Sequence, residues 1–316
     1  MTSFYFLKKF SILLRLSRFM KPACYSLTFF VAIFAVCLGI AEDKNAKPQE
    51  FIRVRYAENP SNRVVALDTA ALRFESKSKK KNSPTVDLIA AVHIADKEYY
   101  EELNKLFGTY DVVLYELVAD EGTRIDPKIE AESDGKSLTG GVQNGFASVL
   151  KLEHQLRHID YTKKNMLHAD MDAELFMQRM IQEGELGRIF VRAMAQSIKQ
   201  SGLGSDKTAG RIFGSWLVSR DKSVALKRIM AVEMCKEIEK QLWIFEGDDG
   251  ATLIHERNEC ALKKLRDVLK SGDKKKIAIF YGAAHLYDFS EQLEKNFNMR
   301  PVQIDWIRAW NMEGKK

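Results

Sequence analysis

The stretch LIAAVHIADKEYYEEL, residues 88–103, decides the fold class. It begins with a continuous run of small and branched apolar residues, which is typical of a strand buried on both faces in a parallel sheet. The run stops at His93 and gives way to an amphipathic helical pattern over residues 96–107. A second apolar run follows over residues 111–117. A strand, a helix and a strand within about thirty residues predict a right-handed crossover unit.

The rest of the chain extends this unit into a larger α/β domain, predicted over residues 63–310. Residues 143–270 show mostly the three-to-four spacing of apolar residues that indicates helices. The predicted fold is therefore a mixed, largely parallel sheet flanked by helices, with a large helical insertion between the sheet halves. The other expected elements are a polar linker over 42–62, strands over 63–76, 276–281 and 300–310, and a helix near 287–296.

The N-terminal segment is predicted to be an export signal. Residues 25–41 carry no charge, follow Lys21 and end in Gly39-Ile40-Ala41, the small residues that signal cleavage requires. Residues 1–41 are long for a signal, which favours Met20 as the true start. The alternative is an uncleaved N-terminal anchor, which would be the only membrane contact. The sequence thus predicts a periplasmic or extracellular protein.

Charge and cysteines narrow the function classes. The chain has 49 Lys and Arg against 43 Asp and Glu, but residues 1–41 hold five basic and no acidic residues, so the remainder is nearly neutral. Composition therefore gives no argument for a nucleic-acid partner. Outside the signal only Cys235 and Cys260 remain, which either pair in an exported domain or are two buried thiols.

Three ionisable residues close apolar runs in the same way. They are His93 after residues 88–92, Glu116 in YDVVLYELVAD, and His285 in KIAIFYGAAHLYDF. Because sites form at the carboxyl ends of parallel strands, these three side chains are predicted to converge. Two imidazoles and a carboxylate are a common ligand set for a divalent metal ion, and they are also a plausible base and acid without a metal. Gly282, three residues before His285, permits a positive φ or a close backbone approach.

The order of these motifs resembles the TraB/PrgY/GumN family, which is similar to the animal TIKI proteins proposed to be metal-dependent proteases. The family pattern is Gly-x-x-His, a Glu at a strand end, Arg-Asn or Arg-Asp in a late helix, and a second Gly-x-x-His. Here the pattern corresponds to His93, Glu116, Arg257-Asn258 and Gly282 to His285, with Ala90 in place of the first glycine. The resemblance covers residues 63–310 and implies a site of metal ligands and catalytic residues.

Arg257 and the remaining histidines each have two interpretations. Arg257 either binds a substrate carboxylate or an oxyanion, or forms a salt bridge with Glu116 or a nearby acid. His168 and Asp170, which precede a predicted helix, and Asn258 are candidates for supporting the site. The alternative is that Asp170 or Asp172 caps that helix. His154 and His158, four residues apart, are expected on a helix surface.

Two functions fit these residues. The first is an exported, metal-dependent hydrolase of peptide or ester bonds, in which His93, Glu116 and His285 hold the ion and Glu116 and Arg257 are catalytic. A metal-free variant, with histidine as the base, resembles the erythromycin-esterase-like enzymes. The second is a non-catalytic protein that sequesters a peptide or a haem-like ligand among the Met- and Phe-rich helices. The partner is a peptide or a small molecule in either case.

Overall fold

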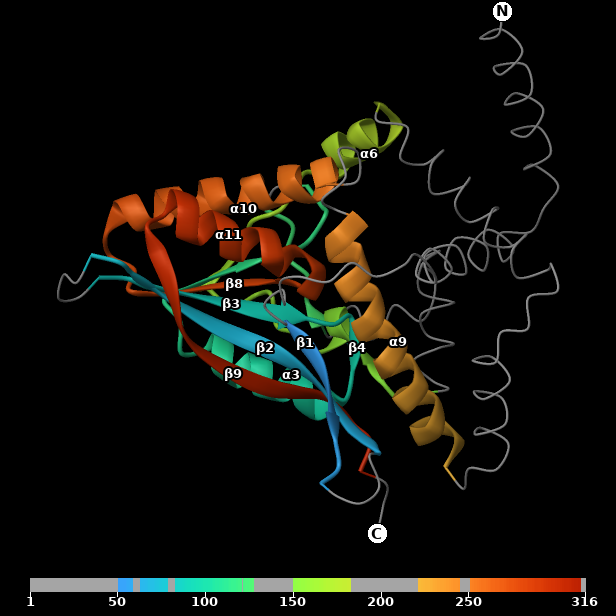
Figure 1. The fold of residues 1–316 in the computed structure, drawn as a ribbon. Helices are drawn as coiled ribbons and strands as arrows, with labels where there is room; N and C mark the ends of the chain where they lie inside the picture. Colours follow the sequence, from blue (N-terminus) through green and yellow to red (C-terminus); the bar gives the residue numbers. More distant parts are fainter. Residues whose placement is uncertain are drawn as a thin grey trace, which may run out of the picture.

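A seven-stranded mixed sheet forms the centre of the computed structural model (Figure 1). Its strands are β1 (Ile52–Tyr56), β2 (Val64–Ser76), β3 (Thr85–Ala91), β5 (Val112–Tyr115), β7 (Met166–His168), β8 (Lys276–Gly282) and β9 (Met299–Asn311). The structure describes residues 51–58, 63–78, 83–120, 122–127, 150–182, 221–244 and 251–313.

The sheet has a parallel half and an antiparallel half. The path of neighbouring strands is β1-β2-β3-β8-β5-β7, and β9 pairs with the other side of β2. The strands β3, β8, β5 and β7 run parallel, whereas β1, β2 and β9 pair antiparallel with their neighbours. The predicted fold class, α/β with a mixed and largely parallel sheet flanked by helices, is confirmed. All four parallel strands end at the same edge of the sheet.

Helices cover both faces of the sheet because the side chains of a strand alternate between the two faces. On β8, Phe280 packs against Phe107 of α3 (Lys97–Phe107), with ring centroids 4.8 Å apart. The next residue, Tyr281, packs against Phe289 of α11 (Leu286–Asn296) at 5.0 Å. Figure 1 shows α3 on one side of the sheet, with α11 and α10 (Ala251–Ser271) on the other.

Two predicted boundaries need correction. The polar linker predicted over residues 42–62 contains β1, whose alternating Ile52, Val54 and Tyr56 pair with β2. The region 143–270 does contain helices, namely α6 (Ala173–Gln182), α9 (Lys222–Ile244) and α10, but its described part also contains the strands β6 (Glu153–His154) and β7. These strands form because β6 pairs with β4 (Ile94–Ala95) and β7 extends the main sheet beside β5, which are long-range contacts.

The prediction that His154 and His158 lie on the surface of one helix is wrong. His154 belongs to β6 and His158 follows the short 3-10 helix η1 (Gln155–Arg157), so the two histidines do not share a helix face.

The export signal lies outside the described residues. Within the described part of the chain, no helix is long and apolar enough to span a membrane. No disulfide joins Cys235 and Cys260.

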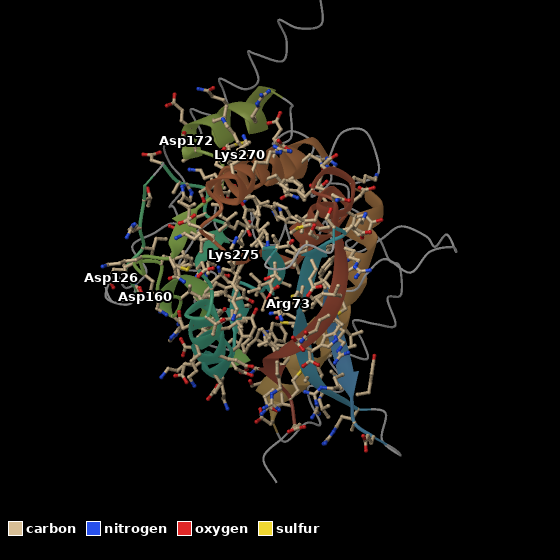
Figure 2. All side chains as sticks on the ribbon, turned by 90° about the vertical axis from the view of Figure 1, so that its left-hand side faces the viewer. Arg73, Asp126, Asp160, Asp172, Lys270 and Lys275 are labelled. Carbon is tan, nitrogen blue, oxygen red and sulfur yellow. The ribbon has the colours of Figure 1, made fainter. Side chains whose placement is uncertain are left out.

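A partly buried ion pair, in which only the carboxylate is buried, stabilises the end of the sheet where the parallel strands begin. Asp87 of β3 accepts two hydrogen bonds from Arg73 of β2, at 3.0 and 2.8 Å, and one from the Tyr110 hydroxyl at 2.6 Å. Arg73 is labelled on the sheet in Figure 2. Asp87 is 4 % exposed, so each of its partners offsets the cost of burying its charge.

Replacing Tyr110 with Phe is therefore expected to lower the free energy of unfolding by about 1–3 kcal/mol, because it removes a hydrogen bond to a buried charge. Urea denaturation monitored by circular dichroism measures the change. Tyr56→Phe is the control, since Tyr56 is 46 % exposed, and its stability is expected to equal that of the wild type. Equal stability of the Tyr110→Phe variant would show that Arg73 alone neutralises Asp87.

Candidate functional site

Four parallel strands each end near an ionisable side chain. His93 follows β3, Glu116 follows β5, and Asp170 lies two residues after β7. His285 follows β8 at the end of the short 3-10 helix η2 (Ala283–His285). Glu116, Asp170 and His285 lie in one cluster around Arg257 of α10. The predicted convergence at strand ends is thus observed for Glu116 and His285, and the structure adds a fourth strand end with Asp170.

Arg257 is the centre of this cluster. Its Nε and Nη2 donate to the two oxygens of Asp170 at 3.0 and 2.6 Å, and Nη2 also donates to Oε1 of Glu116 at 2.7 Å. Its Nη1 lies 3.3 Å from Nε2 of His285. The Asp170 side chain is fully buried, whereas those of Glu116 and Arg257 are 13 % and 14 % exposed. The salt-bridge interpretation of Arg257 is therefore confirmed.

Glu116 is ionised because its surroundings favour the charged form. Burial disfavours the carboxylate, but the electrostatic influence of His285, Arg257 and His93, together with the Gly282 amide, outweighs it and lowers the pKa of Glu116 to about 2. The Gly282 N–H donates to Oε2 at 2.6 Å. A Cβ at Gly282 would lie 3.2 Å from that oxygen, so a larger residue there would require the carboxylate to shift slightly. Glu116 is therefore a fixed negative charge at neutral pH, not a base.

His285 has one defined tautomer. Its Nδ1 lies 2.7 Å from Oδ1 of Asn258. The orientation of that amide is determined, because its Nδ2 donates to the His285 carbonyl and to a carboxylate oxygen of Asp288 at 3.1 and 2.7 Å. Nδ1 must then carry the proton, and Nε2 carries a lone pair, 3.6 Å from Oε1 of Glu116. Burial lowers the pKa of His285, so its imidazole is neutral at pH 7.

His93 lies at the exposed rim of this cluster rather than in its centre. Its Nδ1 is 3.2 Å from Oε1 of Gln155, whose Nε2 donates to the Tyr161 hydroxyl at 2.7 Å. In this orientation His93 also carries its proton on Nδ1, which leaves Nε2 available. His93 is near enough to both Glu116 and His285 to lower the pKa of each through its electrostatic influence. Gln155 was missed by the sequence analysis because its neighbours His154 and His158 were expected on a helix surface.

The predicted divalent metal ion does not fit the residues as they are placed. Among the described ranges of the chain, no three His, Cys, Asp or Glu side chains are arranged to hold a metal ion. The guanidinium of Arg257 contacts both Glu116 and His285, two of the three predicted ligands, and supplies a positive charge there. The metal ion stays a prediction, and no chemical step proposed below passes through it.

The other predicted supporting residues separate into two groups. Asp170 and Asn258 belong to the site, through Arg257 and His285 respectively. His168 does not contact the cluster, because its Nε2 is 2.5 Å from the Leu117 carbonyl and so steadies the loop after β5. Asp172, labelled near α6 in Figure 2, caps that helix by accepting from the backbone N–H groups of Glu174 and Leu175.

Comparisons with models of protein families, with curated proteins and with solved structures found no match. The resemblance to the TraB/PrgY/GumN family therefore stays a prediction from the sequence motifs.

Removing the guanidinium is expected to destabilise the protein severely. In Arg257→Met, Glu116 and the fully buried Asp170 lose their shared cation, so the free energy of unfolding should fall by about 3–5 kcal/mol. Arg266→Met on the same helix is the matched control, because its pair with Glu259 is exposed and contributes about 1 kcal/mol or less. Chemical denaturation of both variants measures the difference, and equal losses would contradict the central role of Arg257.

His154 makes the stability depend on pH. Burial, with smaller effects of His93 and Arg157, lowers the pKa of His154 to about 4, below the ordinary value of about 6.5. The neutral form is favoured in the folded state, so its contribution is complete above pH 6.5 and is lost as the pH falls towards 4. His154→Asn retains an acceptor for the Leu156 N–H and does not titrate. Its unfolding free energy relative to the wild type should be higher at pH 5 than at pH 8, and a pH-independent difference would refute this assignment.

Proposed function

We propose that the protein is an exported hydrolase of peptide or ester bonds, in which His285 is the general base. The observation that carries this proposal is the state of His285: a neutral imidazole whose Nε2 lone pair lies between Glu116 and Arg257. A base must be unprotonated and correctly oriented before the substrate arrives, and Asn258 provides the orientation.

Each neighbour of His285 has a distinct role in this reaction. Nε2 takes a proton from a water molecule, and the oxygen of that water attacks the carbonyl carbon of the substrate. The imidazolium that forms is stabilised by the carboxylate of Glu116, 3.6 Å away. Nη1 of Arg257 donates to the oxyanion that develops on the carbonyl oxygen. The 3.3 Å separation of Nη1 from Nε2 is long for a hydrogen bond, so a water or a substrate oxygen competes for that N–H.

His93 is the second acid–base group of the proposed site. It is exposed, it lies near enough to influence Glu116, and Gln155 holds its Nδ1. In the proposed reaction the oxyanion collapses and the bond between the carbonyl carbon and the leaving nitrogen or oxygen breaks, while protonated His93 donates a proton to that leaving atom. His285 then releases its proton to solvent, and His93 takes one up. The substrate is a peptide or another small molecule that reaches the site through the partly exposed edges of Glu116 and Arg257.

The proposal predicts large losses of turnover when the site is altered by single substitutions. His285→Gln should lower turnover by a factor on the order of a hundred or more, because Gln has no basic nitrogen. Glu116→Gln should cause a similar loss, because the imidazolium loses its counter-charge. The measurement is hydrolysis of a panel of fluorogenic peptides and nitrophenyl esters by purified protein, with circular dichroism of each variant as the check on folding.

Asp87→Asn is the matched control for Glu116→Gln, since both residues are buried carboxylates that accept from an arginine. Asp87 lies at the opposite end of its strand, so this variant should lose stability and retain turnover per folded molecule. A folded His285→Gln variant with wild-type turnover would overturn the proposal.

Metal analysis with chelator treatment tests the metal prediction separately: activity that is lost with a chelator and restored by a divalent ion would support the metal-dependent hydrolase. Ligand binding without product in every assay would support the sequestering protein instead.

A further inference from the structure

We propose that Asp288 is a positioning residue for His285, acting through Asn258, and that His255 completes this chain at the protein surface. The inference rests on the proposed function of His285 as the base. It concerns two residues, Asp288 and His255, to which the sequence analysis assigned no role in the site.

The chain is continuous from the surface to the base. Nδ1 of His255 lies 2.8 Å from Oδ1 of Asp288, whose other oxygen accepts from Nδ2 of Asn258 at 2.7 Å. Oδ1 of Asn258 accepts from Nδ1 of His285 at 2.7 Å. Exposure falls along the chain, since the side chains of His255, Asp288 and His285 are 50 %, 9 % and 7 % exposed. Each contact lies within the ordinary hydrogen-bond range.

The direction of each hydrogen bond follows from chemistry. A carboxylate only accepts, so Asp288 requires a donor on both sides. Nδ2 of Asn258 is therefore turned towards Asp288, which leaves Oδ1 to face His285. An oxygen at that position holds the proton on Nδ1 and the lone pair on Nε2. Asp288, together with the His285 carbonyl that also accepts from Nδ2, thus holds the amide orientation that sets the tautomer of an imidazole that Asp288 does not touch.

The chain positions the imidazole and does not relay protons. A side-chain amide does not pass a proton from its oxygen to its nitrogen at a useful rate, so the Nδ1 proton stays on His285. The arrangement therefore differs from a histidine held directly by a carboxylate, where the negative charge would adjoin the ring. Here the charge of Asp288 is separated from His285 by the Asn258 amide, and it is shared with His255 and with Gln292, whose Nε2 lies 3.4 Å from Oδ1.

Another explanation of Asp288 is purely structural. It lies in the first turn of α11, where a negative charge interacts favourably with the helix dipole. That role requires a charge near the helix terminus, but it requires neither the burial of Asp288 nor its contact with Asn258. The two explanations differ in one observable, the tautomer of His285.

The test uses the full-length protein with the pair Asp288→Ser and Asp288→Asn. Serine is too short to reach both His255 and Asn258 but remains favourable in a first helical turn. Asparagine retains an oxygen that accepts from Asn258. With ¹⁵N-labelled histidine, the ring nitrogen shifts of His285 report the tautomer, and the His285→Gln variant assigns the signals. The spectra are recorded at a temperature well below the midpoint of thermal unfolding of the least stable variant.

The wild type and Asp288→Asn are expected to show the Nδ1–H tautomer, whereas Asp288→Ser should show a mixture of both tautomers. Turnover should fall about 10–100-fold in Asp288→Ser at an unchanged KM, with partial recovery in Asp288→Asn. Glu291→Gln, an exposed position three residues further along the same helix, should match the wild type in both measurements. A single Nδ1–H tautomer in folded Asp288→Ser overturns the inference, even if turnover falls. Because the tautomer is measured without a substrate, this result is independent of whether the protein proves to be a hydrolase.

Discussion

The structure of the site depends on one guanidinium held between two carboxylates. Arg257 projects from α10 onto the carboxyl ends of the parallel strands, where Glu116 and Asp170 both accept its protons. Two negative charges so close together and so little exposed would repel each other without a shared cation. Each partner is costly to bury alone, so the three residues position one another, and with them α10 against the ends of β5 and β7.

This charge arrangement also sets the chemistry available to His285. One positive and two negative charges leave the cluster with a net negative charge, which favours an imidazolium when one forms. Burial opposes that charge in the resting state and lowers the pKa of the ring. The two effects together suit the proposed role of His285 as a base, which must be neutral before the reaction and stabilised after it takes a proton. The lowered pKa of Glu116, about 2, is the reason that the proposed reaction assigns it the role of counter-charge and not that of base.

The two clusters of charged residues lie at opposite ends of the parallel strands, the structural one where the strands begin and the candidate site where they end. The Arg73–Asp87–Tyr110 cluster lies where the parallel strands begin and has the same ingredients as the site, a buried carboxylate with an arginine. There, however, Asp87 has all its oxygens paired within a closed structural cluster, with no basic lone pair beside it. At the other end of the strands His285 presents Nε2 next to a partly exposed arginine. An arginine paired with a buried carboxylate is therefore weak grounds for proposing a function. The neutral imidazole of His285 is what distinguishes the cluster around Arg257 from the cluster around Asp87.

The sequence by itself determined the α/β class, the crossover unit and the strand-end positions of His93, Glu116 and His285, because continuous apolar runs and abrupt polar stops are local patterns. For Arg257 it left two interpretations open, a substrate or oxyanion contact and a salt bridge with Glu116 or a nearby acid. Only the tertiary structure decided that Asp170 shares this arginine, that Asn258 selects the tautomer of His285, and that His93 remains at the rim. The strands β6 and β7 were missed because each is short and is stabilised by pairing with a strand distant in the sequence, which no local pattern records. The strand β1 was also missed, although it pairs with the neighbouring strand β2.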